Sequence, residues 1–494
     1  MSLAPWPADP LLHEVFTWVW LADLSTRYDR RVTLADVPDE VWDDIARPGI
    51  DAVWLMGVWQ RSEVGAAIAR SNPAMAAAQR EALPDVVDAD VVGSAYCVRS
   101  YTCDEALGGE AGLAAARAAL AQRGVRLALD LVPNHVAPDH PWVVDHPEYF
   151  VTGTVDDLQR DPGAYLEVHG TVFACGRDPY FPAWPEVLQL DASNPLLRAA
   201  MAEQVASIVT RCDALRCDMA MLVLDDVFER TWGRRADTDG GFWPEVFAAG
   251  RATNPDVRFW AEAYWDLEPV LVDQGFDACY DKRLYDRLVH RAPVDEVRAH
   301  LSAPLDWQRH TVRFVENHDE PRAASVFAPA RHLATLTAVC TLPGVALLHE
   351  GEADGRRVRV PVTLGRRPVE PVDTDVRAAV DRLVAAIGGG VRRGDWRMLA
   401  VDGWADNQSA RRLLAWSWVS ATARHVVVVN LSDERADGRV RLDWHGLGGR
   451  RCVFDDLLVG VSYQRDGDAV LGDGLYVALD PDAAHLFRVE ILAT

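Results

Sequence analysis

Short apolar segments in the first 390 residues repeatedly end in charged or polar side chains. Four of these segments read VRLALDLVPNH, ALRCD, RFWAEAY and VRFVENHDEPR. Their polar residues are Asp130, Asn134, His135, Arg216, Asp218, Glu262, His318, Asp319 and Arg322. A single acidic residue after a strand often caps a helix, whereas several carboxylates gathered at one place repel one another. The pattern therefore indicates a site for chemistry rather than a requirement of folding.

Glycosidic bond cleavage is the reaction that such a group of carboxylates suits. One carboxylate attacks or stabilises the anomeric carbon, and a protonated acid donates to the leaving oxygen. Arg216 and Asp218 are two residues apart, so on a strand both side chains face the same side. We expect the arginine to keep Asp218 ionised, as a nucleophile needs. Glu262 follows Phe259 and Trp260, and apolar surroundings suit a general acid.

The elements that must hold these residues are eight predicted strands separated by helical patterns. The apolar runs lie at 15–20, 52–56, 125–129, 214–217, 257–261, 275–280, 312–315 and 345–348. Strands that alternate with helices pair in parallel and predict a closed (β/α)₈ TIM barrel, whose chemistry lies at the carboxyl ends of the strands. The polar residues above would then share one mouth.

Two further units interrupt or follow the barrel. Residues 136–190 are rich in Pro, aromatics and Asp and predict a short inserted domain, called domain B. Residues 1–135 and 191–390 are then the barrel, and residues 391–494 are predicted to form a C-terminal antiparallel β-sandwich. Its expected strands are 413–419, 426–431, 440–444 and 475–479, with Asp437-Gly438 among the turn signals.

Composition limits the partners. The formal charge is −24, which repels phosphate backbones and anionic lipid, so nucleic acid and membrane are poor partners. The 18 Trp fit either a Trp-rich core or carbohydrate, whose apolar faces stack on indoles. The N-terminus lacks the pattern of a signal peptide. The eight cysteines do not show the spacing of zinc-binding motifs, so we expect free thiols. We therefore expect a cytoplasmic protein, with no prediction of its oligomeric state.

Four motifs resemble the conserved regions of the α-amylase family, glycoside hydrolase family 13. They are DLVPNH (130–135), LRCDMA (215–220), AEAY (261–264) and ENHDEPR (316–322), in that family's order. GSAYCVRSY (93–101) is similar to a segment after the family's second strand, and VLQLD (187–191) resembles the motif that closes its domain B. GLYVALDPDAAHLF (474–487) resembles the end of its C-terminal domain.

The resemblance implies a role for each matching residue. Asp218 matches the nucleophile, Glu262 the acid/base, and Asp319 the third carboxylate, which grips the sugar hydroxyls. The residues that match contacts to the sugar are Tyr96, His135, Arg216 and His318. Arg322 is similar to a residue of α-glucosidases and is also expected to bind substrate. Asp130 matches a structural aspartate that orders the site, and Asn134 is a structural neighbour.

Departures from the family pattern bear on calcium. Leu222 stands where many α-amylases carry a histidine whose carbonyl binds calcium, and the inserted segment is short. We therefore expect no metal or cofactor, although Asn134 remains as a potential calcium ligand.

Several activities remain open. The resemblance favours a retaining hydrolase that cleaves α-1,4-glucosidic bonds of maltooligosaccharides or α-glucans. An exo-acting α-glucosidase, or a transglycosylase or isomerase that forms glucan or trehalose, would use the same residues. A non-catalytic sugar-binding protein is disfavoured because every catalytic position is filled. The sequence does not fix linkage, chain length or endo against exo action.

Overall fold

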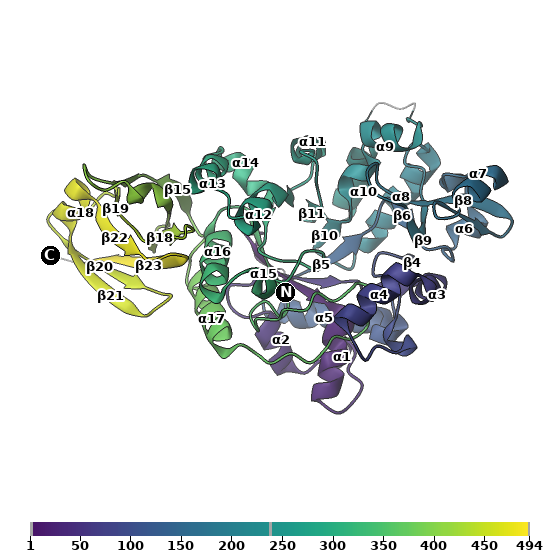
Figure 1. Ribbon diagram of the computed structural model, residues 1–494, viewed down its shortest axis with the longest axis horizontal. Coiled ribbons are helices and arrows are strands. Elements are labelled where there is room, and N and C mark those ends of the chain that lie inside the picture. The colour runs from purple at the N-terminus through teal and green to yellow at the C-terminus, as the bar shows by residue number, and fades with distance from the viewer. Residues whose placement is uncertain (1–2, 237–239, 493–494) are drawn as a thin grey trace.

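Eight parallel strands close into a barrel in the order β1-β14-β13-β12-β11-β10-β5-β2 in the computed structural model, which describes residues 3–236 and 240–492 (Figure 1). The barrel strands are β1 (Leu11–Phe16), β2 (Ala52–Met56), β5 (Arg126–Leu131), β10 (Ala214–Cys217), β11 (Arg258–Ala261), β12 (Ala278–Tyr280), β13 (Thr311–Arg313) and β14 (Val345–His349). The predicted (β/α)₈ barrel is confirmed.

Helices connect the strands around the barrel. They include α1 (Thr17–Arg27), α2 (Asp39–Ile45), α5 (Gly109–Gln122), α8 (Pro195–Ile208), α9 (Asp225–Trp232), α10 (Phe242–Thr253), α11 (Glu268–Gln274), α12 (Lys282–Val289), α13 (Val294–Leu301), α14 (Leu305–Arg309), α15 (Ala323–Val326), α16 (Pro329–Thr341) and α17 (Thr374–Gly388). Asn194 caps α8 by accepting a hydrogen bond from the Leu196 amide, and Pro195 opens the helix. Both are the residues that helix N-termini favour.

The first strand differs from its prediction. The expected run was 15–20, but β1 ends at Phe16 and α1 begins at Thr17. The stretch from Leu11 to Trp20 is apolar almost throughout, and a short apolar run has no periodicity that separates a buried strand from a buried helix. Parallel pairing of Leu12 with Ala52 of β2 and Leu347 of β14 decides the register.

Two insertions lie beyond the carboxyl ends of the strands. The segment predicted as domain B carries the antiparallel sheet β6-β9-β8-β7, and a smaller insertion after β2 pairs β3 with β4. These elements are β6 (His135–Val136), α6 (Trp142–Asp145), α7 (Val155–Arg160), β7 (Tyr165–Val168), β8 (Thr171–Gly176), β9 (Trp184–Gln189), β3 (Trp59–Arg61), α3 (Glu63–Ser71), α4 (Pro73–Ala82) and β4 (Val98–Cys103). The smaller insertion was not predicted.

The C-terminal region forms two antiparallel sheets at the opposite end of the molecule from α7 and β8 (Figure 1). They contain β15 (Asp395–Leu399), β17 (Leu413–Val419), β18 (Arg424–Asn430), β23 (Ala483–Ile491), β20 (Arg451–Asp456) and β21 (Val461–Asp466), and in the second sheet β16 (Val401–Asp402), β19 (Ala436–Val440) and β22 (Leu475–Leu479), with α18 (Gly467–Asp473) beside them. Side chains of both sheets share one core, so the predicted sandwich is confirmed. The indole of Trp418 donates to the Thr341 carbonyl at 2.7 Å and ties the sandwich to α16.

One strand of the sandwich was misplaced by the sequence. The expected strand 440–444 is replaced by β19 at Ala436–Val440, which contains the predicted turn Asp437-Gly438. A Cβ at position 438 would lie 2.7 Å from Cγ1 of Val401. Gly438 therefore lies inside a strand, where the absence of a side chain allows two strands to pack closely, and it does not form a turn.

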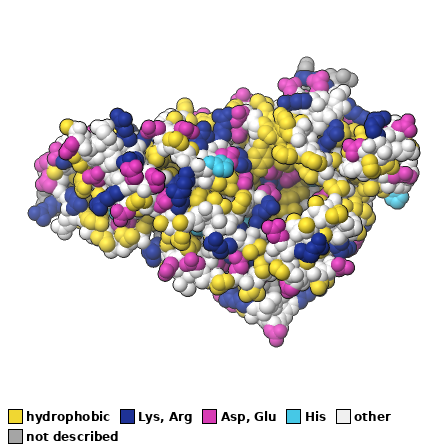
Figure 2. All heavy atoms as spheres, viewed as in Figure 1, with side chains coloured by type: hydrophobic (Ala, Val, Ile, Leu, Met, Phe, Trp, Pro, Cys, Tyr) yellow, Lys and Arg dark blue, Asp and Glu magenta, His cyan; other side chains and the backbone are white. Residues whose placement is uncertain are grey.

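Burial accounts for most of the remaining compositional signals. Among the largest fully buried side chains are Trp54, Trp59, Trp243, Trp416 and Trp418, and the eight cysteines are buried and free. No helix in the described part of the chain is long and apolar enough to cross a membrane. Acidic and basic side chains are interspersed over the face shown in Figure 2, so the net negative charge does not form one patch there.

Candidate active site

A cavity of about 290 Å³ opens at the carboxyl ends of the barrel strands. Five of the residues predicted from the sequence line it, namely Tyr96, His135, Asp218, Glu262 and Asp319. Its other lining residues are Ser94, Trp184, Glu186, Val187, Met219 and Tyr264. The expectation that these carboxylates converge is confirmed. Ser94, Val187, Met219 and Tyr264 lie within motifs quoted in the sequence analysis, and Trp184 is one of the aromatic residues of the inserted segment, whereas Glu186 had no signal there.

The barrel ladder places Asp218 and Glu262 side by side. The Asp218 amide donates to the Leu131 carbonyl of β5 at 2.8 Å, and the Glu262 amide donates to the Cys217 carbonyl of β10 at 3.0 Å. Each carboxylate is thus the first residue past its strand and remains in the ladder. Met219 then turns with φ 42°, a left-handed conformation that non-glycine residues adopt at functional turns. Its amide donates to Oε2 of Glu262 at 2.8 Å.

Arg216 holds both carboxylates from beneath the cavity. Its Nη1 lies 2.8 Å from Oδ1 of Asp218, and its Nη2 lies 2.7 Å from Oε2 of Glu262. Burial raises the pKa of Asp218 to about 8, although Arg216 acts in the opposite direction. Arg216 opposes this rise but is shared with Glu262, and the ionised state of Asp218 stays a prediction.

The second carboxylate group centres on His318. Its Nε2 lies 2.9 Å from Oδ2 of Asp319 and 2.7 Å from the Tyr96 hydroxyl, and Nδ1 contacts Oε1 of Glu14 at 2.5 Å. Burial alone would lower the pKa of His318, but Asp319 and Glu14 outweigh it and raise the pKa to about 10. Burial would raise the pKa of Asp319, but the imidazolium of His318 holds it at about 2. Asp319 thus faces the cavity ionised.

Glu14 was missed in the sequence. It is the only acidic residue of β1, lies in the apolar run LLHEVF, and is fully buried. A charged residue inside a buried strand requires a partner, and this is the signal that could have found it. His318, 304 residues away, is that partner.

Five predicted residues lie outside the cavity lining, namely Asp130, Asn134, Arg216, His318 and Arg322. Asp130 accepts from the Trp54 indole at 3.2 Å and from the Gly57 amide at 2.9 Å, and burial raises its pKa to about 6. It therefore orders the strand ends, as the resemblance implies. Arg322 pairs with Glu316 at 2.8 Å and donates to the Glu350 carbonyl at 2.8 Å. Arg322 does not line the cavity, and its contact with substrate stays a prediction.

Asn134 is the residue retained from the family's calcium site. Its side-chain Oδ1 accepts from Nε2 of Gln189 at 2.9 Å, and its backbone carbonyl accepts from the same nitrogen at 3.0 Å. Calcium takes about six to eight oxygen ligands, and the described residues contain no group of three or more His, Cys, Asp or Glu suited to a metal. The residues around Asn134 do not fit a calcium site, and calcium independence stays a prediction.

Comparison with known proteins agrees with this geometry. No protein-family model matches the chain. An α-amylase from Dictyoglomus thermophilum is 22% identical over 275 residues, 51% of this chain and 52% of that protein. A noncanonic maltogenic α-amylase from Thermotoga neapolitana superposes with a TM-score of 0.66 at 16% identity, covering 98% of this chain and 99% of that one. The chain resembles the α-amylase family.

The resemblance to the α-amylase family extends to a second activity. An α-glucosidase from Culex pipiens is 22% identical over 279 residues, 47% of this chain and 48% of that protein. The chain spans about half the length of these two curated relatives. At such identities the structural likeness establishes the fold of the α-amylase family, and the chemistry rests on the site.

Proposed function

We propose that this protein is a retaining glycoside hydrolase that cleaves α-1,4-glucosidic bonds of maltooligosaccharides or α-glucans. The observation that carries the proposal is the sharing of Arg216 between Asp218 and Glu262 at the wall of one cavity. Two carboxyl groups held close together by one cation can supply a nucleophile and an acid. The names of the relatives, an α-amylase and an α-glucosidase, point the same way.

The reaction divides into two displacements. An oxygen of Asp218 bonds to the anomeric carbon while the glycosidic bond breaks, and Glu262 gives its proton to the departing oxygen. Glu262, now ionised, takes a proton from water, whose oxygen bonds to the anomeric carbon and releases Asp218. Arg216 stabilises the carboxylate that is charged at each stage. The Tyr264 hydroxyl donates to Oε1 of Glu262 at 2.8 Å and fixes its orientation.

Asp319 and Tyr96 complete the surroundings of the sugar. Asp319 faces the cavity as a carboxylate and accepts hydrogen bonds from sugar hydroxyls. The Tyr96 ring stacks on His318 with centroids 5.4 Å apart, which holds the phenol ring at the cavity wall. Burial lowers the pKa of His135 to about 4, so its imidazole is neutral at physiological pH.

Exo-acting α-glucosidase activity is a second candidate. A cavity of about 290 Å³ lies at the small end of ligand pockets, which run from about 300 to 1,000 Å³. A small cavity favours the terminal unit of a chain over a long internal segment. Transfer of the glycosyl group to a sugar hydroxyl in place of water would use the same residues.

One time course of products tests the proposal. The protein is incubated with maltoheptaose, maltose, trehalose and glycogen, and the products are separated by chromatography. A mixture of short maltooligosaccharides at early times supports endo-acting hydrolysis, glucose alone supports the exo-acting candidate, and products longer than the substrate indicate transfer. Failure to act on any of the four substrates would overturn the proposal.

A further inference from the structure

Glu186 is an acidic residue of the cavity that the proposed mechanism does not use. It lies on β9, in the inserted segment, and lines the same cavity as Asp218 and Glu262. Only 9% of the residue is exposed, and its Oε2 has no hydrogen-bond partner among the described residues. No basic side chain in the described part of the chain forms an ion pair with it. Buried polar groups almost always have partners, so this carboxyl group requires an explanation.

Burial also favours the protonated form of Glu186. With no cation beside it, burial raises the pKa of its carboxyl group. A protonated carboxyl group both donates and accepts hydrogen bonds. A sugar hydroxyl likewise donates and accepts, so the two groups are complementary.

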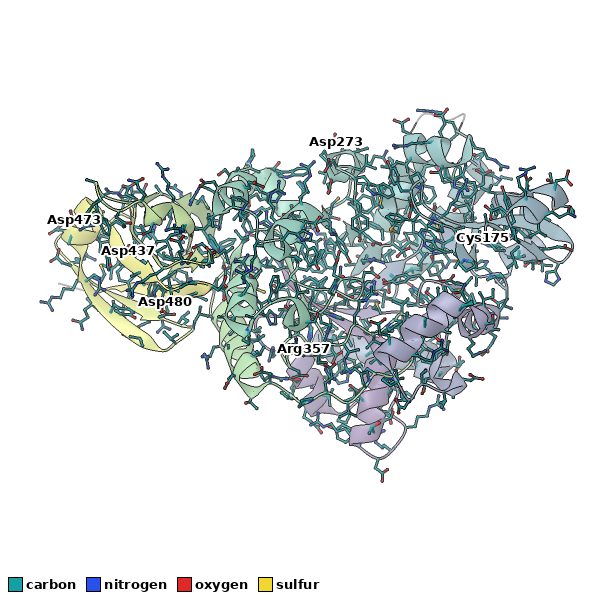
Figure 3. The ribbon with its side chains drawn as sticks, in the orientation of Figure 1. Cys175, Asp273, Arg357, Asp437, Asp473 and Asp480 are labelled. Carbon is teal, nitrogen blue, oxygen red and sulfur yellow. The ribbon has the colours of Figure 1, made fainter. Side chains whose placement is uncertain are left out.

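The backbone around Glu186 is held from three directions. The strand β9 pairs with β6 through Val136 and Leu188, and with β8 through Cys175, which Figure 3 labels. The thiol of Cys97, which lies just before β4, donates to the Glu186 carbonyl at 3.1 Å. Since the backbone is fixed, the carboxyl group is preorganised for a ligand, which lowers the entropy lost on binding.

An aromatic ring accompanies Glu186 on the same strand. Trp184 lines the cavity, and its ring lies 5.2 Å from that of His135. An indole ring offers an apolar face, and a carboxyl group offers a hydrogen bond to the edge of the same ligand. Together they form a pair that suits a pyranose ring, which has apolar faces and a hydroxylated edge.

We propose that Glu186 is a specificity-determining residue that hydrogen-bonds one hydroxyl of the sugar ring bound in the cavity. This inference rests on the proposed function and deepens it. Recognition of a fully hydroxylated, uncharged pyranose would then depend on a residue of the inserted segment. A site built to bond a hydroxyl rejects the analogue that lacks it, since its own polar group is then left unpaired.

The test measures kcat/KM of the wild type, Glu186→Leu and Glu186→Gln on 4-nitrophenyl α-glucoside and on its four monodeoxy analogues. The wild type is expected to discriminate against one analogue by about tenfold in kcat/KM, the size of one hydrogen bond. Glu186→Leu should lose about tenfold on the parent glucoside and show no loss on that analogue, which is the coupling signature of a direct contact. Glu186→Gln, which still donates and accepts, should keep most of the discrimination.

A thermal melt separates this role from a structural one. Removing a buried group that lacks a partner should leave the Tm of Glu186→Leu equal to or above that of the wild type. The matched control is Glu167→Leu on β7, where the glutamate is exposed and outside the cavity. It should leave kcat/KM unchanged on every substrate.

Three outcomes would overturn the inference. An active wild type whose Glu186→Leu variant keeps its discrimination among the analogues would remove Glu186 from substrate recognition. A variant that fails to fold, or loses Tm and activity equally on all substrates, would make the residue structural. A wild type inactive on every α-glucoside would overturn the proposed function itself and this inference with it.

Discussion

Nη2 of Arg216 donates to Oε2 of Glu262 at 2.7 Å, which joins strand β10 to the residue that follows the neighbouring strand β11. The contact matters because the other terminal nitrogen of the guanidinium bonds Asp218. One cation therefore sets the combined charge of the two carboxyl groups, and any change of the cation acts on both at once.

Replacing Arg216 by lysine keeps the positive charge but should still impair catalysis strongly. Lysine carries one point charge and cannot serve two carboxylates in a fixed fork. We expect Arg216→Lys to lower kcat by about 10²- to 10³-fold. Arg216→Met should also destabilise the fold by about 3–5 kcal/mol, because it leaves buried carboxyl groups without their partner. Steady-state kinetics and urea melts measure the two effects, with the exposed Arg160→Lys as the control. An active Arg216→Lys would contradict the shared role.

The two carboxyl groups should fail in different ways when changed to amides. Asp218→Asn is expected to be inactive on all substrates, because its oxygen forms the covalent bond. Glu262→Gln should lose about 10²- to 10⁴-fold on maltooligosaccharides. It should lose much less on 2,4-dinitrophenyl α-glucoside, whose leaving group needs no proton. Parallel kinetics on the two substrates decide this. Equal losses for Glu262→Gln on both would refute its acid role.

The reaction should retain anomeric configuration. Retaining pairs hold their carboxyl groups about 5–5.5 Å apart, and inverting pairs leave about 6.5–9.5 Å for a water. Asp218 and Glu262 bond the two terminal nitrogens of one guanidinium, which holds the two carboxyl groups close together and favours the shorter spacing. Proton NMR of freshly formed maltose should show the α-anomer first. The β-anomer as first product would exclude the covalent mechanism.

His318 should make stability depend on pH in the alkaline range. Its pKa is about 10 in the fold against an ordinary value of 6.5, so its contribution is complete below pH 6.5 and is lost as pH rises through 10. The Tm difference between the wild type and His318→Asn should therefore shrink between these values.

A second buried histidine provides the control for that experiment. Burial lowers the pKa of His425 to about 4, so its contribution is complete above pH 6.5 and is lost as pH falls through 4. The Tm difference for His425→Asn should shrink in the acid range instead. The same pH trend for both variants would contradict the charged state assigned to His318.

Chelation should leave activity intact. The carboxamide oxygen of Asn134 already accepts from Gln189. A structural calcium would add RT ln(1 + [L]/Kd), about 2.7 kcal/mol at a hundredfold excess over Kd, and would appear as a Tm shift of several degrees on chelation. We expect a negligible shift. Loss of activity in EDTA, restored by added calcium but not by magnesium, would show that a metal site exists.

The sequence by itself determined the architecture and the two central carboxylates. Asp218 and Glu262 each follow an apolar run directly, and parallel strands of a barrel end at one mouth, so local pattern and strand order were enough to place them together. The same reasoning does not place Arg322, which follows its strand by nine residues, lies outside the cavity lining and pairs with Glu316. A strand fixes the direction of a side chain only as far as the strand continues.

The tertiary structure alone decided which charges meet. Glu14 and His318 are 304 residues apart and share no local pattern, and Glu186 reaches the cavity only because β9 folds back over the barrel mouth. Protonation followed from the same packing. The sequence shows which groups can ionise, whereas burial and the number of partners on each cation set their pKa values. Those quantities exist only once distant segments are packed together.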